Sequence, residues 1–249
     1  MGMTTPTGYA VYLLGQLAIN CIVFIALCDI CKRSFRLDEL LSFCGGAFLL
    51  GALGYLAFWI AYANYAVFGV VRVVLLAGVV IYFASVAYRH TLRVYGWLAE
   101  PVLVASFFFL IAMCFGLSDG GLLNPPEAAA ERFSHALPSD NRIPFFLSQA
   151  LHAGKIPSPL FGDWLASDRP PLQTGLYLLL TLQNSNGGYQ AVASWLQATY
   201  LLGVWALLTA MALPTAARRM VLLACACSRP RSSTHSMRGR RCSPPRTCC

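Results

Sequence analysis

Long apolar stretches, separated by short polar segments, make up most of this chain. Several of them provide the ~20 residues that an α-helix needs to cross the hydrocarbon core of a bilayer. They cover residues 9–28, 40–62, 65–87, 95–117 and 191–213. Because a spanning helix satisfies its own backbone hydrogen bonds in lipid, this pattern predicts an all-α fold, a polytopic bundle of transmembrane helices.

Basic residues between the stretches predict which helix ends share a side of the membrane. Lysine and arginine favour the cytoplasmic side, and two connecting segments contain the cations Lys32, Arg33, Arg36, Arg89, His90 and Arg93. The N-terminus and residues 118–170 are therefore predicted to lie outside. The first stretch lacks the basic start and the cleavage site of a signal peptide, so we interpret it as a retained span.

Two features inside the spans need an explanation. The second stretch is rich in glycine, which permits close helix packing in lipid. Arg72 lies inside the third stretch, where a charge is costly. Because Arg72 is about two helical turns from the outer end, its side chain is predicted to reach the interface by snorkelling.

The ten cysteines do not establish a redox compartment. Four lie in apolar stretches: Cys21, Cys28, Cys44 and Cys114. Cys31 is predicted to lie in a basic loop, and the other five are in the tail. Buried thiols among apolar helices behave as small apolar side chains.

After the four spans of residues 1–117, residues 118–170 are predicted to form an external loop with short juxtamembrane helices. A loop of this length is uncommon unless it has a function. Pro125 and Pro126 precede a short predicted helix at residues 127–137, which Pro138 ends.

A second short helix is predicted for residues 143–153. Good N-cap residues (Ser139, Asp140 and Asn141) precede it, and Gly154 follows it. Apolar side chains recur on one side of this helix (Phe146, Leu147, Ala150 and Leu151), with Ser148, Gln149 and His152 around the other. Such a helix is predicted to lie in the membrane interface.

Residues 171–223 are predicted to contain a short helix and then the last span. Pro170 and Pro171 start the short helix, which ends near residue 184. Its length, about 21 Å at ~1.5 Å per residue, is too short for an upright span. It is either a thin span, which places Arg218 and Arg219 outside against the charge rule, or a helix that enters and leaves on one side.

Composition supports a membrane protein and argues against a nucleic-acid partner. Hydrophobic residues make up 57% of the chain and charged residues 11%, and the mean hydropathy is +0.61. The net charge of +8 comes from arginines near the C-terminus (Arg218, Arg219, Arg229, Arg231, Arg238, Arg240, Arg241 and Arg246). Because the rest of the chain is close to neutral, we expect no nucleic acid to bind.

Residues 224–249 form a basic tail of Cys, Arg, Ser and Pro without periodicity. A metal site built from Cys225, Cys227, His235 and Cys242 lacks a recognisable ligand spacing, so no metal is expected. A natural disordered tail is one interpretation. The favoured interpretation is a slip of the reading frame near Met220, which makes the chain the front part of a longer membrane protein.

The candidate chemistry lies in the external loop. Asp140 is a candidate general base for an acceptor hydroxyl. Arg142 and Arg169 are candidates to hold a phosphate, since guanidinium groups pair with two phosphate oxygens at once. From these residues alone a structural interpretation is favoured, in which Asp140 caps a helix and Asp168 and Arg169 precede a proline helix start.

The same loop resembles the first external loop of the GT-C class of membrane glycosyltransferases, which use dolichyl- or polyprenyl-phosphate sugars. The matching positions are Asp140 for the acidic motif, Ala150, Leu151 and Gly154 in the short helix, and Arg169, Pro170, Pro171 and Leu172 for the proline motif. The resemblance covers about forty-five residues. It implies that Asp140 is the catalytic base, that a lipid phosphate is the sugar donor and that the anomeric carbon is inverted, with Arg142, Asp168 and Arg169 around the donor phosphate.

Two departures from that family limit what the resemblance implies. Four spans precede the loop where many members have one, although both arrangements leave the loop outside. Asn141 stands where a second acid is often found, so neither a two-acid site nor a metal or other cofactor is expected.

The sequence therefore predicts a truncated glycosyltransferase of a bacterial inner membrane, inactive when expressed alone. A transporter or channel subunit, which would place charges or helix breaks within the spans, and a structural membrane protein are the alternatives.

Overall fold

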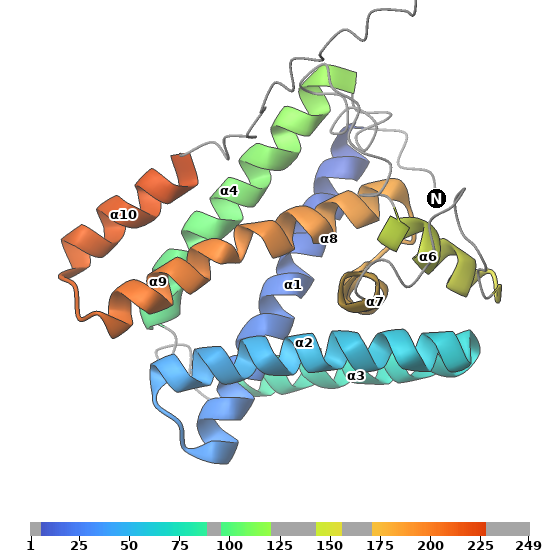
Figure 1. Ribbon diagram of the computed structural model, residues 1–249, viewed down its shortest axis with the longest axis horizontal. Coiled ribbons are helices and arrows are strands. Elements are labelled where there is room, and N and C mark those ends of the chain that lie inside the picture. The colour runs from blue at the N-terminus through green and yellow to red at the C-terminus, as the bar shows by residue number, and fades with distance from the viewer. Residues whose placement is uncertain (1–5, 89–95, 121–142, 156–170, 228–249) are drawn as a thin grey trace, which may run out of the picture.

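A computed structural model describes residues 6–88, 96–120, 143–155 and 171–227 of the chain. Within these residues the protein is all-α, as the apolar pattern predicts (Figure 1). The helices are α1 (Pro6–Phe35), α2 (Glu39–Ala63), α3 (Tyr65–Tyr88), α4 (Gly96–Gly120), α6 (Ile143–His152), α7 (Pro171–Leu180), α8 (Asn186–Ala198), α9 (Tyr200–Ala210) and α10 (Thr215–Cys227).

Four stretches of the described chain are long and apolar enough to cross a membrane. They are Ala10–Phe35, Glu39–Ala63, Tyr65–Val86 and Gly187–Ala210, the last made by α8 and α9 together. Helix α4 has 25 residues, of which Ala99–Met113 forms a shorter apolar segment. These helices indicate a multi-pass integral membrane protein in contact with the lipid bilayer.

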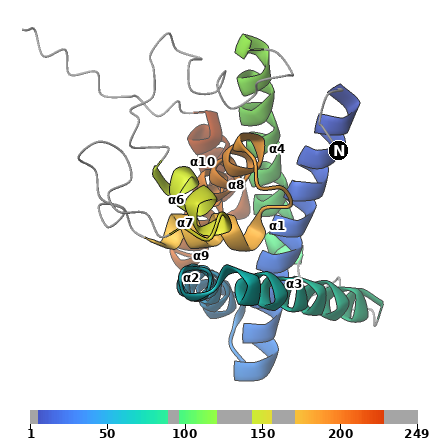
Figure 2. The ribbon, with the colours of Figure 1, turned by 90° about the vertical axis from the view of Figure 1, so that its right-hand side faces the viewer.

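The spans alternate in direction, so their ends gather on two sides. The start of α1, the α2–α3 turn, the end of α4 and helices α6 and α7 lie towards the right and the top of Figure 1. The end of α1, the start of α4 and the α9–α10 turn lie towards the left and the bottom. Figure 2 views the same arrangement from its right-hand side, with α1 and α4 running close to the vertical. We refer to these as the N-terminal side and the opposite side.

Helix α1 continues seven residues beyond the predicted span, to Phe35. The predicted basic loop of residues 29–39 is therefore wrong for Asp29–Phe35. Asp29 is only 1% exposed; it accepts hydrogen bonds from Arg33 Nε at 2.8 and 2.9 Å and from the hydroxyl of Tyr82 in α3 at 2.6 Å. This pairing lets the charged turn stay helical beside the other spans.

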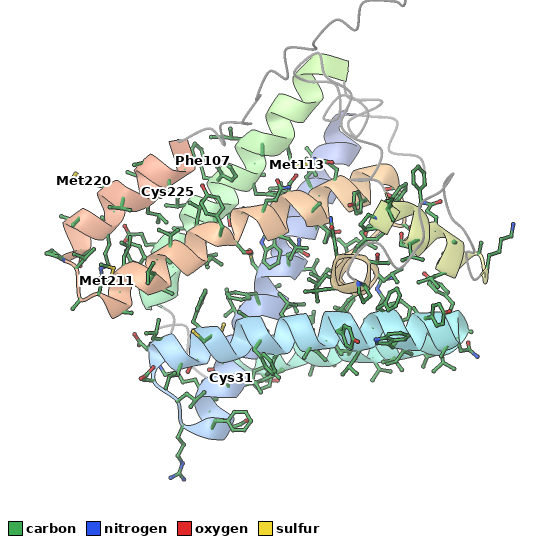
Figure 3. All side chains as sticks on the ribbon, in the orientation of Figure 1. Cys31, Phe107, Met113, Met211, Met220 and Cys225 are labelled. Atoms are coloured by element: carbon green, nitrogen blue, oxygen red, sulfur yellow. The ribbon has the colours of Figure 1, made fainter. Side chains whose placement is uncertain are left out.

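Cys31 is consequently a buried helical residue, not a loop residue as predicted. It lies where α1 passes α2 (Figure 3). A Cβ atom on Gly45 of α2 would come within 2.9 Å of Cys31 Sγ, and one on Gly46 within 2.5 Å of Cys28 Sγ. Two glycines of α2 thus make room for two thiols of α1, which confirms that glycine in the second span allows close packing.

An uncharged turn at Asn64 joins the second and third spans. The backbone N–H of Asn64 closes α2 by donating to Ile60 O at 2.8 Å. Its side-chain oxygen accepts from the backbone N–H groups of Ala66 and Val67 at 3.0 and 3.2 Å, and so caps α3. One residue therefore ends one span and begins the next.

The closest helix crossing lies between α2 and α7. A Cβ atom on Gly175 would overlap the carbonyl oxygen of Gly54, and one on Gly54 would lie 2.6 Å from the side chain of Leu176. Only glycine at both positions lets the two backbones approach this closely. The crossing fixes α7 against the middle of α2.

At the opposite side, α10 turns back along α9 and α4. Arg219 forms an ion pair with Glu100, near the start of α4, with Nε 2.5 Å from the carboxylate, and this contact raises the pKa of Arg219. Arg218 donates to the hydroxyls of Thr209 and Thr215 at 2.9 and 3.0 Å and lies over the ring of Trp205. Both arginines are thus on the same side as the start of α4.

Candidate functional site

The residues that the sequence singles out for chemistry lie outside the described part of the chain. They are Asp140, Arg142, Asp168 and Arg169, together with the predicted helix at residues 127–137. What the structure does describe is the pair of helices that these residues precede, α6 and α7. Helix α6 begins directly after Arg142, and α7 begins two residues after Arg169.

Helix α6 confirms the predicted second short helix and its end. It covers Ile143–His152, and Gly154 follows with φ +67°, a backbone conformation that favours glycine. The backbone N–H groups of Gly154 and Lys155 close the helix by donating to Leu151 O and Ala150 O at 3.0 and 2.9 Å.

The prediction of which side chains of α6 lie on its apolar and polar sides is partly wrong. Leu147 and Leu151, predicted on the apolar side, are buried in the protein, and so is Ser148, predicted on the polar side. Its hydroxyl donates to the carbonyl oxygen of Phe145 at 2.6 Å, one turn earlier. Because Ser148 satisfies its hydroxyl within its own helix, that side of α6 can pack against the protein.

The first turns of α6 and α7 are in contact. The hydroxyl of Thr174, in the first turn of α7, donates to the carbonyl oxygen of Pro144 in α6 at 3.3 Å. The ring of Phe145 packs edge-on against Tyr177, with centroids 6.1 Å apart. It also contacts the ring of Tyr189 of α8 in a tilted arrangement, with centroids 5.4 Å apart. The structure thus brings together the two helix starts that follow the predicted site residues.

The far end of α7 is held by two polar side chains from other spans. Gln16 of α1 donates from Nε2 to Leu180 O at 2.9 Å and accepts from the backbone N–H of Leu182 at 2.8 Å. Arg72 of α3 donates from Nε to Leu179 O at 3.1 Å and from a terminal nitrogen to Thr181 O. Backbone groups that lose their helical partners where α7 stops are thereby satisfied.

The snorkelling prediction for Arg72 is therefore wrong. Its guanidinium reaches inward, to the C-terminal end of α7, where the helix dipole favours a cation. The carbonyl oxygens of Leu179 and Thr181 take the place that water and headgroups would take at the interface.

The polar contacts at the end of α7 continue along α1. Tyr12 donates to Gln16 Oε1 at 3.3 Å, and Gln16 Nε2 donates to Asn20 Oδ1 at 2.9 Å. These residues are spaced by four, so they lie on one face of the helix. Asn20 is fully buried, and its Nδ2 atom is one of the few buried side-chain nitrogens of the described residues without a hydrogen-bond partner. We call Tyr12, Gln16 and Asn20 the polar ladder.

The interruption between α7 and α8 is also closed by side chains. The hydroxyl of Tyr177 donates to Asn184 Oδ1 at 3.0 Å and accepts from the backbone N–H of Ser185 at 3.1 Å. Ser185 in turn caps α8 by accepting from the N–H of Gly188 at 3.1 Å. The chain therefore breaks its helix inside the protein without leaving these backbone groups unpaired.

Helix α7 is not part of the four candidate membrane spans of the described residues. It is seen end-on in Figure 1, where α2, α8 and α9 run across the page, so it lies across the spans. With only ten residues, it spans about 15 Å. Of the two predicted alternatives, the structure favours a helix on one side, and α8–α9 then returns the chain to the side of Glu100 and Arg219.

The described residues offer little for metal or nucleophilic chemistry. They contain no group of three or more His, Cys, Asp or Glu side chains that could hold a metal ion. Cys21 and Ser106 line a small cavity of about 10 Å³ between α1, α4 and α8, room for about one water molecule.

We call the hydrogen bonds from Gln16 and Arg72 to the end of α7 the clamp on α7. The sequence analysis predicts neither this clamp nor the polar ladder, although the sequence contains a signal for the ladder. Polar residues spaced by four in an otherwise apolar span indicate one buried face.

Compared with known proteins, the chain matches no family model, no curated protein and no solved structure.

Proposed function

We propose that this chain is part of a membrane glycosyltransferase that transfers a sugar from a polyprenyl phosphate to an acceptor. Asp140 acts as the general base, and Arg142, Asp168 and Arg169 surround the donor phosphate. The observation that supports this proposal is the contact between the first turns of α6 and α7, through Thr174 and Pro144.

The covalent chain limits how far the proposed site residues lie from that contact. Asp140 precedes Ile143 by three residues and Arg169 precedes Pro171 by two. At a maximum of ~3.6 Å per residue, these separations are at most about 11 and 7 Å. The carboxylate and the guanidinium can therefore meet at one place, next to two helix N-termini.

Two helix N-termini suit a donor with a phosphate group. Unpaired backbone N–H groups and the helix dipole favour an anion at this end of a helix. Arg142 and Arg169 add two guanidinium groups, which bind phosphate oxygens in pairs. Together these groups stabilise the negative charge that develops on the phosphate when the sugar leaves.

The proposed reaction is a single displacement. The carboxylate of Asp140 takes the proton of an acceptor hydroxyl while the hydroxyl oxygen bonds to the anomeric carbon. The bond from that carbon to the phosphate oxygen breaks, its electron pair leaves with the lipid phosphate, and the anomeric carbon is inverted. We propose that residues 118–170 face the outside of a bacterial inner membrane, on the N-terminal side of the fold.

Donor binding provides the first test, because the chain alone is expected not to turn over. The full chain is reconstituted in vesicles with and without polyprenyl phosphate, and the midpoint of thermal unfolding is measured. A ligand that binds the folded state raises this midpoint. Arg142→Ala and Arg169→Ala should reduce the increase, whereas Lys155→Ala, an exposed cation after α6, should keep it. An equal increase with phosphatidic acid would contradict a donor site.

The role of Asp140 is tested separately. Asp140→Asn should retain the increase with polyprenyl phosphate, because a general base acts on the acceptor. Transfer of labelled sugar, in a protein that includes any further spans of the gene, should then be lost.

A transporter is the second candidate, and the interrupted helix favours it. Half-helices and unwound segments near charged or polar side chains form solute sites in many transporters. Here the end of α7, Arg72 and the polar ladder provide such an arrangement within the spans. Swelling of chain-containing vesicles in gradients of small polar solutes, lost in Asn20→Leu, would support transport. Swelling equal to that of protein-free vesicles would reject it.

A further inference from the structure

Three aromatic side chains form an exposed face on α2, close to the α2–α3 turn. Tyr55, Trp59 and Tyr62 are spaced by four and three residues, so they lie on one side of the helix. They are 47%, 47% and 40% exposed. Their rings contact one another edge-on, with centroids 6.1 Å apart for Tyr55 and Trp59 and 5.8 Å apart for Trp59 and Tyr62. We call these three residues the aromatic face.

The polar atoms of the aromatic face have no hydrogen-bond partner among the described residues. This holds for the hydroxyls of Tyr55 and Tyr62 and for the indole nitrogen of Trp59. Tyr200 of α9 gives the contrast: it is similarly exposed, but its hydroxyl donates to Cys225 O at 2.6 Å. The aromatic face thus presents several donors outward.

Large apolar side chains make up much of the other exposed surface of α2 and α3. Phe48 of α2 and, on α3, Val70 and Val74 are among the most exposed hydrophobic residues of the protein. Such side chains suit the hydrocarbon core. A hydroxyl or indole N–H without a partner is costly there, so the aromatic face does not fit the same environment as Phe48.

Tyrosine and tryptophan side chains, which have an apolar ring and a polar donor, suit the interface between the acyl chains and the headgroups of a bilayer. Their rings favour an apolar surrounding and their polar atoms favour water, glycerol esters or phosphate, so they gather where acyl chains meet headgroups. The neighbouring Asn64 turn begins where α2 ends and has no charge to compete for this level.

We propose that the aromatic face binds the glycerol and headgroup region of the bilayer on the N-terminal side, and so sets the depth of the protein. Trp59 then lies at the interface. Gly54, where α7 crosses α2, is five residues deeper, about 7.5 Å along the helix. Helix α7 accordingly lies just below the headgroups and not at the centre of the bilayer.

The depth of Trp59 is measured by fluorescence quenching with brominated lipids. A variant that keeps Trp59 alone, with Trp97, Trp164, Trp195 and Trp205 changed to Phe, is reconstituted in vesicles. The lipids contain bromine either near the headgroup or near the bilayer centre. Emission from Trp59 should be quenched more strongly by the shallow bromines.

A matched control is available on the same helix. A second variant moves the single tryptophan to position 48, by Phe48→Trp with Trp59→Phe. This position is eleven residues deeper, about 16.5 Å along the helix, and its emission should be quenched more strongly by the deep bromines.

The single-tryptophan variant lacks the buried Trp195 and Trp205, and their loss could prevent folding. A second measurement avoids this: the emission of the Trp59→Phe variant is subtracted from that of the unaltered chain, and the quenching of the difference reports on Trp59. In either measurement, stronger quenching of Trp59 by deep bromines overturns the proposal. So does the absence of quenching at both depths, because the face is then covered by protein, for example by a second copy of the chain.

Discussion

Arg72 in the third span donates a hydrogen bond from Nε to the carbonyl oxygen of Leu179, 107 residues later in the chain, at 3.1 Å. The charge of Arg72 would destabilise an isolated span in lipid. In the folded protein its guanidinium caps the C-terminal end of α7. The pairing explains why an arginine is tolerated among valines and leucines.

Replacing Arg72 should therefore destabilise the protein. Arg72→Leu leaves the carbonyl oxygens of Leu179 and Thr181 without their donor, and we expect a loss of about 1–3 kcal/mol. Arg72→Lys keeps the charge but not the forked geometry, so its loss should be smaller. The measurement is the midpoint of thermal unfolding in detergent. The exposed Lys155→Leu is the control, and equal midpoints for Arg72→Leu and this control would refute the cap.

The crossing of α2 and α7 should be sensitive to a single methyl group. Gly175→Ala places a Cβ atom on the backbone of Gly54, and overpacking of this kind costs about 1–3 kcal/mol. Gly51→Ala lies in α2, in the same helix as Gly54, but no atom lies within 4 Å of the added Cβ. This variant should leave stability unchanged or slightly higher, since alanine favours helices. Both variants are compared by thermal unfolding. A harmless Gly175→Ala would mean that the two helices are not in contact.

The buried carboxylate at the end of α1 should matter more than the exposed one nearby. Asp29→Leu removes the acceptor for Arg33 and Tyr82, and we expect a loss of at least about 1 kcal/mol. Glu39→Gln, in the exposed pair with Lys32 at 3.4 Å, should have little effect because exposed pairs contribute little. Equal losses in chemical denaturation would show that Asp29 is not buried in the folded protein.

Two members of the polar ladder, Gln16 and Asn20, should respond differently to substitution. Gln16→Leu removes both hydrogen bonds to the end of α7 and should lower stability by about 1–3 kcal/mol. Asn20→Leu removes a buried nitrogen that has no partner, so its loss should be smaller than that of Gln16→Leu. Thermal unfolding of the two variants decides. A larger loss for Asn20→Leu would indicate that a water molecule or a ligand occupies its free hydrogen-bonding position.

The fold could be predicted from the sequence because span length and polar punctuation are local signals. Asn64 marks the turn between two spans, and Gly154 marks the end of α6, without any reference to distant residues. Asp29 was misplaced because its partner Tyr82 comes from another span. Ser148 was misplaced because its hydroxyl bonds to its own helix, which a count of polar residues does not detect.

The candidate site could be predicted only in part, for a related reason. Asp140 and Arg169 were chosen by their order in the loop and by a family resemblance, and their roles stay predictions. The contact between Thr174 and Pro144 depends on tertiary packing, as does the partnership of Gln16 with the backbone at Leu180. Neither contact has a local signature in the sequence.

The clamp on α7 also has a consequence for the order in which the protein is assembled. Gln16 and Arg72 enter the membrane with the first and third spans, but their partners at Leu180 and Leu179 are synthesised 164 and 107 residues later. During translation both side chains lack these acceptors, and the glycine surface of α2 lacks α7. The early spans therefore cannot reach their final packing until residues 171–182 have left the ribosome, and a helix made much later completes the core around the first spans.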